Sequence, residues 1–319
     1  MTTPDARLTA LAGSRERWGV DGFSFGIALG GITGHASWQQ HFRWAERADA
    51  AGAHSVWLPE MHFTPGACTT PLACLSALAA GTSRLRLGTT SLLLPIHDPV
   101  RIARDVRVLD ALASGRIILG LGRGFRKPLF EALGISAREK RDRFDASLDV
   151  MLREWEPWSP PMGVAAFGRK GLEQAARHGL PYLASPLESL DLVAENLAFH
   201  REHLPPGVDP SVLAVPIMRT VFISNDEREA MRVFGAMERE ARAMTRGPVP
   251  AALGRAAEAP LEERVLVGSV ERVTDEIARY RERIGLDLLI CRVDVPGTST
   301  EQQENSFRHL VEDVAPALV

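Results

Sequence analysis

Short runs of β-branched and other apolar residues alternate along the chain with longer segments whose apolar positions recur every three to four residues. The short runs predict β-strands and the longer segments predict amphipathic helices. In the segment 37–51, for example, Phe42, Ala45 and Ala48 follow helical spacing, and Gly52 is placed to end the helix. This alternation is typical of parallel strands joined by helices.

Eight strands are predicted, each followed by a helix. The strands cover residues 23–29, 54–58, 85–91, 116–122, 162–167, 182–185, 212–224 and 286–294. The helices cover about 37–51, 71–80, 102–112, 138–155, 171–179, 187–203, 226–244 and 307–314. Eight such units favour a closed (β/α)8 TIM barrel over an open doubly wound sheet, which more often has about six strands.

The chain contains no linker, internal repeat or compositional break that would divide it. We therefore expect residues 1–319 to form a single barrel domain, with residues 1–22 as an N-terminal extension. Residues 245–264 are rich in Pro, Ala and charge and separate the seventh and eighth predicted strands. This insertion is interpreted as a candidate lid loop, and a surface excursion without a role is the alternative.

Composition narrows the class of partner. The net charge is only −3 and no basic block is interleaved with aromatic residues, so nucleic acid is not an expected partner. Cys68, Cys74 and Cys291 form no CxxC pair, and their odd number argues against a disulfide framework. The first residues lack a signal peptide, and no apolar run approaches the roughly 20 residues of a membrane helix. A soluble cytoplasmic protein without a membrane partner is predicted.

Candidate chemistry gathers where predicted strands end, because the site of a barrel lies at the C-terminal ends of its strands. Glu60 and His62 follow the second strand and form a possible acid/base pair. A single histidine at such a place is more often structural. No HExxH or Cys/His spacing indicates a metal, and no GxSxG indicates a hydrolase.

Two glycine-containing turns are candidate ligand sites. In the first, Gly168 and Gly171 flank Arg169 and Lys170 at a helix start, where free N–H groups and basic charge suit a phosphate. A solvated basic turn is an equal alternative. The second turn consists of Gly122, Arg123 and Gly124. This turn departs from the G-x-G-x-x-G spacing of dinucleotide-binding sites. Its glycines would still allow the backbone to approach a flat or anionic ligand closely, and Arg123 could pair with a phosphate. The alternative interpretation is that the glycines are needed only because the barrel rim is crowded.

Four longer stretches resemble the luciferase-like flavin monooxygenases, a family that includes the alpha subunit of bacterial luciferase. They are VWLPEMHFTPG (56–66), the run from LRLGTTS to LFEALG (85–134), VAAFGRKGLEQAARHGLP (164–181) and GSVERVTDEIARYRERIGLDLLICRVDVPG (268–297). The resemblance implies a dimeric barrel, expected to be a homodimer. It also implies reduced FMN supplied by a separate flavin reductase, with O2 and a small organic substrate. In one branch the deazaflavin F420 replaces FMN.

The resemblance also assigns site residues. Gly122, Arg123 and Gly124 would meet the flavin on its phosphate side, and the turn 168–171 would hold the phosphate. Thr90 and Ser91 fall where the family often has a non-proline cis peptide beneath the isoalloxazine ring. Glu60 and His62 would lie near the reacting edge of the flavin.

One departure from the family concerns the residue that acts in luciferase catalysis. The luciferase-type motif is E-H-H-F, whereas this chain has Glu60-Met61-His62-Phe63, and a methionine cannot transfer a proton. Either His62 or His97 replaces the missing histidine, or the reaction needs no base there. We predict a two-component FMN-dependent monooxygenase. The alternatives are an F420-dependent hydride-transfer oxidoreductase and a flavin-binding protein that has lost catalysis.

Overall fold

The computed structural model describes residues 11–31, 34–63, 66–244 and 251–318. Its strands pair in parallel, in the order β7-β6-β5-β3-β2-β1-β10-β8-β9, with β4 also paired to β5. The strands are β1 (Ser24–Ala28), β2 (Ser55–Leu58), β3 (Arg86–Thr89), β4 (Leu92–Leu93), β5 (Ile117–Gly122), β6 (Met162–Ala165), β7 (Tyr182–Leu183), β8 (Pro216–Ile223), β9 (Val265–Gly268) and β10 (Leu288–Arg292).

The sheet curls so that its two ends approach each other. Ala184, just after β7, forms a parallel bridge with Ile217 of β8. The N–H of Met218 donates to the carbonyl of Ala184 at 3.1 Å, and the N–H of Ala184 donates to the carbonyl of Pro216 at 3.3 Å. The result is an all-parallel α/β fold consistent with a TIM-like barrel.

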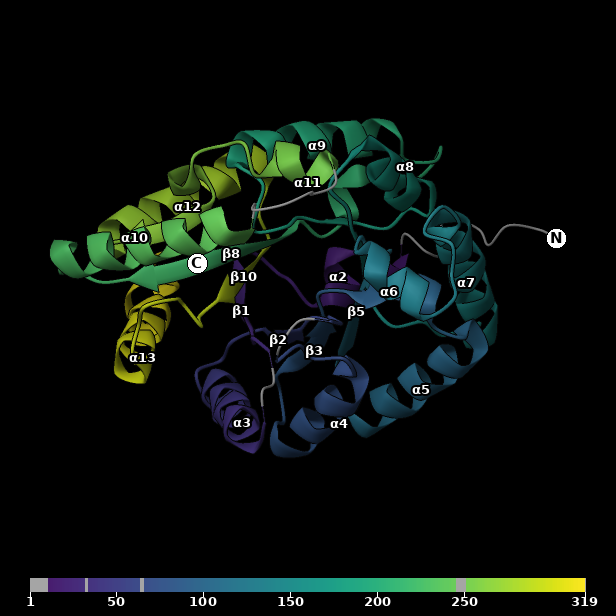
Figure 1. Ribbon diagram of the computed structural model, residues 1–319, viewed down its shortest axis with the longest axis horizontal. Helices are drawn as coiled ribbons and strands as arrows, with labels where there is room; N and C mark the ends of the chain where they lie inside the picture. Colours follow the sequence, from purple (N-terminus) through teal and green to yellow (C-terminus); the bar gives the residue numbers. More distant parts are fainter. Residues whose placement is uncertain (1–10, 32–33, 64–65, 245–250, 319) are drawn as a thin grey trace.

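Helices lie around the outside of the curled sheet (Figure 1). They are α2 (Arg15–Trp18), α3 (His35–Ala50), α4 (Pro71–Gly81), α5 (Pro99–Leu112), α6 (Lys127–Ala132), α7 (Lys140–Trp155), α8 (Arg169–Arg177), α9 (Leu190–Glu202), α10 (Glu227–Met244), α11 (Ala251–Ala256), α12 (Val270–Ile284) and α13 (Thr300–His309), with short helical turns at Leu94–Ile96, Pro210–Val212, Leu261–Glu263, Leu310–Val314 and Pro316–Leu318. Among the described residues, none of the helices combines the length and apolar character that a membrane crossing requires.

Local sequence explains where these helices begin and end. Asp98 caps α5 by accepting from the N–H of Arg101 at 2.8 Å, and Pro99 supplies a first residue already fixed in helical φ. At the other end of a helix, Gly285 adopts a left-handed φ of 70° and stops α12.

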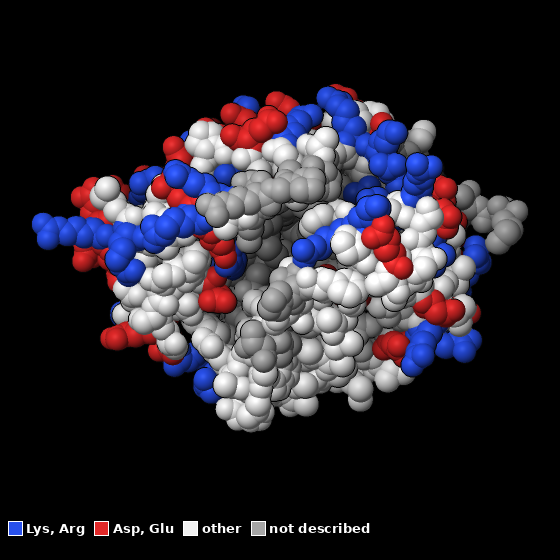
Figure 2. Space-filling view, viewed as in Figure 1, with Lys and Arg blue, Asp and Glu red and all other residues white. Residues whose placement is uncertain are grey.

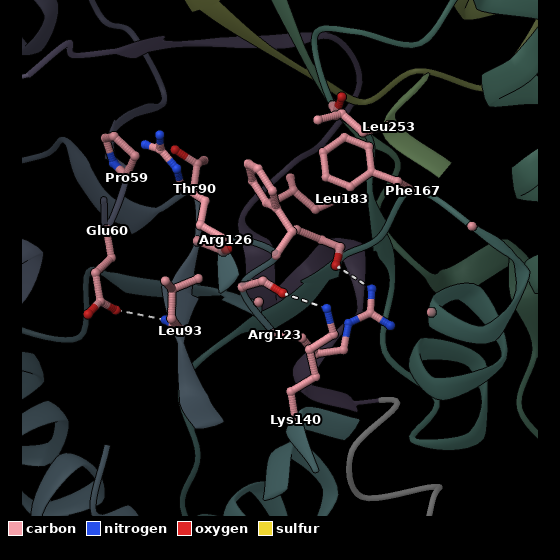
Figure 3. A pocket seen from close by; sticks show the side chains of 18 of the residues that line it. Pro59, Glu60, Thr90, Leu93, Arg123, Arg126, Lys140, Phe167, Leu183 and Leu253 are labelled. Carbon is pink, nitrogen blue, oxygen red and sulfur yellow. Dashed lines mark hydrogen bonds between the residues drawn. The ribbon is translucent and has the colours of Figure 1, made fainter. Parts of the chain in front are cut away.

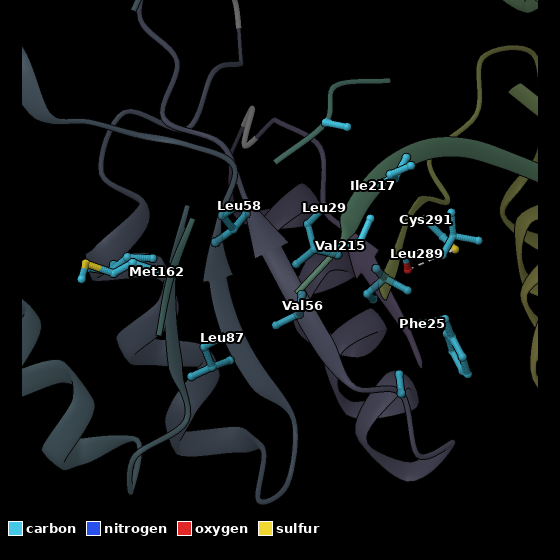
Figure 4. Close-up of a cluster of buried hydrophobic side chains, with 14 of the residues drawn as sticks. Phe25, Leu29, Val56, Leu58, Leu87, Met162, Val215, Ile217, Leu289 and Cys291 are labelled. Carbon is cyan, nitrogen blue, oxygen red and sulfur yellow. Dashed lines mark hydrogen bonds between the residues drawn. The ribbon is translucent and has the colours of Figure 1, made fainter. Parts of the chain in front are cut away.

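The core has two layers because side chains alternate along each strand. Ile117, Leu119 and Leu121 of β5 pack outward into a large cluster between sheet and helices, part of which is shown in Figure 4. Ile118 faces a smaller cluster that also holds Trp18 and Trp57. These two indoles stack with centroids 5.9 Å apart.

The segment around α2 closes the end of the sheet where strands begin. The indole N–H of Trp18 donates to the carbonyl of Met162, the first residue of β6, at 3.3 Å. His54, which precedes β2, hydrogen-bonds through Nε2 to the carbonyl of Trp18 at 2.8 Å. The opposite end of the sheet, where strands finish, is therefore the end available for a site.

All eight predicted strands and their helices are present, although α13 begins at Thr300, before the predicted start at 307. The short elements α2, β4 and α11 were not predicted, and two further regions were missed. Residues 265–284 form β9 and α12, a further βα unit that the eight-unit prediction missed. Residues 216–220 of β8 pair with β10 while residues 220–223 pair with β9, so one long strand serves two partners. Helix α6 was also missed. Both β9 and α6 are too short to show a periodic apolar pattern.

Candidate functional site

A cavity of about 600 Å³ lies at the C-terminal ends of the strands. It opens at the centre of the face seen in Figure 2, which is visibly hollowed there. Because parallel strands all finish at this end, residues far apart in sequence meet around it. Every site residue predicted from the sequence lines the cavity, namely Glu60, His62, Thr90, Ser91, Gly122, Arg123, Gly124, Gly168, Arg169, Lys170 and Gly171.

One end of the cavity is built around the carboxylate of Glu60, whose side chain is fully buried just after β2. The N–H of Leu93 donates to Oε2 at 2.7 Å, as Figure 3 shows. Nε2 of His62 lies 2.9 Å from Oε1, and Nε2 of His97 lies 3.0 Å from both carboxylate oxygens. We call Glu60, His62 and His97 the carboxylate–histidine cluster.

This cluster can hold and move a proton. A buried carboxylate requires hydrogen-bond donors, and imidazoles supply donors that also exchange protons near neutral pH. Of the two histidines, His62 is the one that lines the cavity in the described part of the chain. The structure therefore brings both candidate replacements for the luciferase histidine onto one carboxylate, with His62 on the side of the cavity.

The floor between the two ends is formed by Thr90 and Ser91. The peptide bond between them is cis, as the family resemblance implied. Thr90 Oγ1 is buried and has no hydrogen-bond partner among the described residues. A Cβ at Gly122 would lie 2.0 Å from Ser91 Oγ, so a glycine is required for β5 to pass this close.

The other end of the cavity is basic. Among the described residues, Arg123 forms long hydrogen bonds of 3.4 Å, to the carbonyl of Ala165 and to Gln174 Oε1. Burial lowers the pKa of Arg123 to about 10, and the neighbouring charge of Arg141 contributes to the decrease. Lys140 donates to the carbonyl of Gly124 at 3.2 Å, and burial with repulsion from Arg123 and Arg141 lowers its pKa.

We call Arg123, Lys140 and Arg141 the basic cluster. None of the three forms a salt bridge within the described ranges of the chain. Burial and the charge of Arg141 lower the pKa of Arg123, with Asp145 acting in the opposite direction, while burial, Arg123 and Arg141 lower the pKa of Lys140. Cations held close together without a salt bridge fit an anionic ligand. In Figure 3 the side chains of Arg123 and Lys140 lie across the cavity from Glu60.

The start of helix α8 completes the basic end. Gly168 occupies the N-cap and offers no side-chain acceptor to the first N–H groups of the helix. The guanidinium of Arg123 packs against Gly171, where a Cβ would lie 2.3 Å from Nη2. Arg169 is exposed and stacks on the ring of Phe199, 4.4 Å from its centroid. The phosphate roles of Arg169 and Lys170 stay predictions.

Lys140 and Arg141 were not predicted as site residues. A signal for them exists in the sequence, because both cations open helix α7, where the helix dipole disfavours positive charge. Cations in such a position indicate an anion nearby. Their distance to Arg123, however, depends on how α7 packs beside β5.

Apolar side chains cover the remaining wall, and Leu253 of α11 joins them. Leu253 belongs to the predicted lid segment 245–264, of which residues 245–250 lie outside the described residues. The lid therefore stays a prediction.

Comparison with known proteins identifies the family. A sequence model described as luciferase-like monooxygenase matches residues 22–287. The chain belongs to the luciferase-like monooxygenase family. Among its relatives, the oxygenase component of the flavin-dependent trigonelline monooxygenase of Acinetobacter baylyi is 23% identical over 316 residues, covering 85% of this chain and 87% of that protein. Matches to three other curated relatives span only 30–45% of their lengths.

Solved structures share the fold. Monooxygenase RslO1 from Streptomyces bottropensis superposes with a TM-score of 0.78 at 26% identity, covering 93% of this chain and 100% of that chain. The oxygenating constituent of 3,6-diketocamphane monooxygenase from Pseudomonas putida, solved with FMN, has a TM-score of 0.72 at 19% identity, covering 93% and 99%. At that identity the second likeness concerns the fold alone.

Met61 lies at the cavity edge with 41% of its surface exposed. Its N–H donates to the carbonyl of Cys68 at 2.8 Å, which fixes the backbone between Glu60 and His62. The position that carries the luciferase histidine is thus an apolar contact beside the cluster, and the titratable groups lie on either side of it.

Proposed function

We propose that this chain is an FMN-dependent monooxygenase that uses reduced FMN, delivered by a separate reductase, and O2 to oxidise a small organic substrate. The family and the flavin-dependent relatives support a flavin ligand. The observation that carries the proposal is the basic cluster, in which Arg123, Lys140 and Arg141 lack salt bridges among the described residues, at one end of a cavity with a proton-exchanging cluster at the other.

The residues fit FMN at its phosphate end. Arg123 and Lys140 would bind the phosphate, with Arg141 contributing charge. The N–H groups at the start of α8 would add neutral donors, and Arg169 and Lys170 would add charge at the rim. Gly171 leaves the space that the guanidinium of Arg123 occupies.

The residues also fit the ring. Thr90 Oγ1, buried without a partner in the described chain, suits a polar atom at the edge of a flavin. Gly122, Gly124 and Gly168 let the backbone approach a flat ligand, while the apolar wall excludes water from the reaction. When bound, FMN supplies the redox chemistry, and the protein supplies orientation and proton handling.

The carboxylate–histidine cluster would transfer the proton. His62 lines the cavity and exchanges a proton with the reacting edge, while Glu60 fixes the orientation of its imidazole and stabilises the protonated form. His97, on the same carboxylate, provides a second site for that proton. The Met61 substitution then changes which histidine acts and leaves proton transfer in place.

Binding of reduced FMN, oxidised FMN and reduced F420 under anaerobic conditions tests the proposal. Selective binding of reduced FMN is expected, followed by oxidation of a member of a substrate panel when a generic flavin reductase supplies reduced FMN. Preference for F420 would assign the chain to hydride transfer. Flavin binding without turnover on any substrate would favour the non-catalytic alternative, and no flavin binding would contradict the proposal.

A further inference from the structure

Two cysteines lie beside each other next to the carboxylate–histidine cluster. The sulfur atoms of Cys68, on the segment after β2, and Cys74, in the first turn of α4, are 3.9 Å apart. Cys68 is buried and Cys74 is half-buried. The third cysteine, Cys291 of β10, is fully buried in the core.

The pair is chemically asymmetric. The thiol of Cys68 donates a hydrogen bond to the sulfur of Cys74, which lowers the pKa of Cys74 from 9.0 to about 7. The same hydrogen bond and burial raise the pKa of Cys68. Cys74 is therefore the more acidic thiol of the pair, and the thiolate is the reactive form of cysteine. In Cys291, burial raises the pKa and leaves an unreactive thiol.

We propose that Cys68 and Cys74 form a reversible disulfide in response to hydrogen peroxide. This redox site goes beyond the proposed function and does not depend on it.

The reaction balances as two steps. The Cys74 thiolate attacks one peroxide oxygen, which forms a sulfenic acid and releases hydroxide. The released hydroxide takes the proton of Cys68 and forms the first water. The Cys68 thiolate then attacks the sulfenic sulfur and displaces hydroxide, which takes up the proton that Cys74 lost to solvent and forms the second water, so that two thiols and one peroxide give one disulfide and two waters. Closing the bond requires the sulfurs to approach by about 2 Å, to the S–S length of about 2.05 Å.

The location of the pair gives the disulfide a structural consequence. The carbonyl of Cys68 accepts the N–H of Met61, so the segment with Cys68 is joined to the residues that line the cavity. The disulfide would connect this segment covalently to α4. The half-buried Cys74 can be reached by peroxide and would react first, whereas the buried Cys68 would react second, with the oxidised Cys74.

The test uses the full chain, reduced, desalted and treated with a small excess of hydrogen peroxide. Intact mass, thiol labelling and peptide mapping are then measured. We expect a loss of roughly 2 Da, one labelled thiol of the three cysteines, a peptide pair linking Cys68 to Cys74, and reversal by dithiothreitol. The Cys291→Ser variant is the matched control and should lose the same mass. Cys68→Ser and Cys74→Ser should not.

Three results would overturn the proposal. They are retention of three labelled thiols, stable oxygen addition at Cys74 of the wild-type protein without mass loss, and a disulfide that involves Cys291 or a second chain. The linked Cys68–Cys74 peptide pair of the wild-type protein, together with its loss in dithiothreitol, is decisive even if a serine variant fails to fold.

Discussion

The two ends of the cavity differ in whether their ionisable side chains have ionisable partners within the described part of the protein. At one end Glu60 is a buried carboxyl group whose oxygens are met by a backbone N–H and two imidazoles from the same chain. At the other end Arg123 and Lys140 are cations whose pKa values are lowered, and neither forms a salt bridge within the described residues.

This difference separates chemistry from binding. A charge that is already paired is fixed in place and can exchange a proton without reorganisation, which suits catalysis. Cations that repel one another gain stability only when an anion arrives, which suits ligand affinity. Substitutions at the first end should therefore change turnover, and those at the second end should change affinity.

The largest effect is expected from His62→Gln and Glu60→Gln. Each should lower turnover by about 100-fold or more, because general acid–base catalysis contributes this much. The affinity for reduced FMN should change less than about threefold, because neither residue is assigned to the phosphate. His309→Gln, outside the cavity and paired with Asp313, is the control. Equal losses of turnover and affinity would contradict the assigned role.

Arg123→Ala should have the next largest effect. Loss of a charged hydrogen bond costs about 1.5–3 kcal/mol, so the Kd for reduced FMN should rise roughly 10- to 150-fold. Turnover at saturating flavin should fall little. The control is Arg104→Ala, whose side chain is 71% exposed on α5. A wild-type Kd in the Arg123 variant would place the phosphate elsewhere.

Gly171→Ala separates ligand binding from helix stability. Its Cβ would lie 2.3 Å from the Arg123 guanidinium, which must then move. The Kd for reduced FMN should rise roughly fivefold, equivalent to about 1 kcal/mol. Gly235→Ala in α10, where the nearest atom is 3.6 Å away, is the matched control. It should stabilise the protein slightly without changing affinity; identical flavin titrations of the two variants would exclude a role for Gly171.

The smallest effect concerns pH. Because burial and neighbouring cations lower the pKa of Lys140, this residue loses its charge below its usual value of 10.5. Phosphate binding needs the protonated form, so it is complete at neutral pH and decreases as pH rises through the lowered pKa. We expect a two- to threefold loss of affinity, about the value of one partly exposed charge pair. Lys140→Arg should remove the part of the decrease that precedes the titration of Arg123, whose pKa is about 10, and an early decrease unchanged in that variant would assign it to another group.

The fold could be predicted where the apolar pattern is long. Residues 117–122 alternate between two core layers, and their prediction as a strand is confirmed. Strand β9 was missed because its four residues give no period of their own. Its pairing with the end of β8 is a tertiary contact that the local sequence does not encode. Helix α12 could have been predicted, because its buried residues Val273, Ile277, Tyr280 and Ile284 follow helical spacing.

The predicted site residues could be found from the sequence because they lie at or just after the ends of parallel strands. Glu60, Thr90 and Arg123 follow different parallel strands, and such strand ends converge. By contrast, Lys140 and Arg141 reach the cavity from a helix start, and His97 reaches Glu60 from beyond the short helical turn 94–96. Those contacts depend on long-range packing, so the sequence could name His97 only as an alternative.

The central claim is that the basic cluster binds the phosphate of reduced FMN. Anaerobic titration with reduced FMN and reduced riboflavin, which differ by that phosphate, tests the claim most directly in the wild-type protein and in Arg123→Ala. We expect the wild-type protein to prefer reduced FMN by at least about tenfold, and the variant to lose most of this preference. Equal binding of the two flavins by the wild-type protein, or an unchanged preference in Arg123→Ala, would contradict the account.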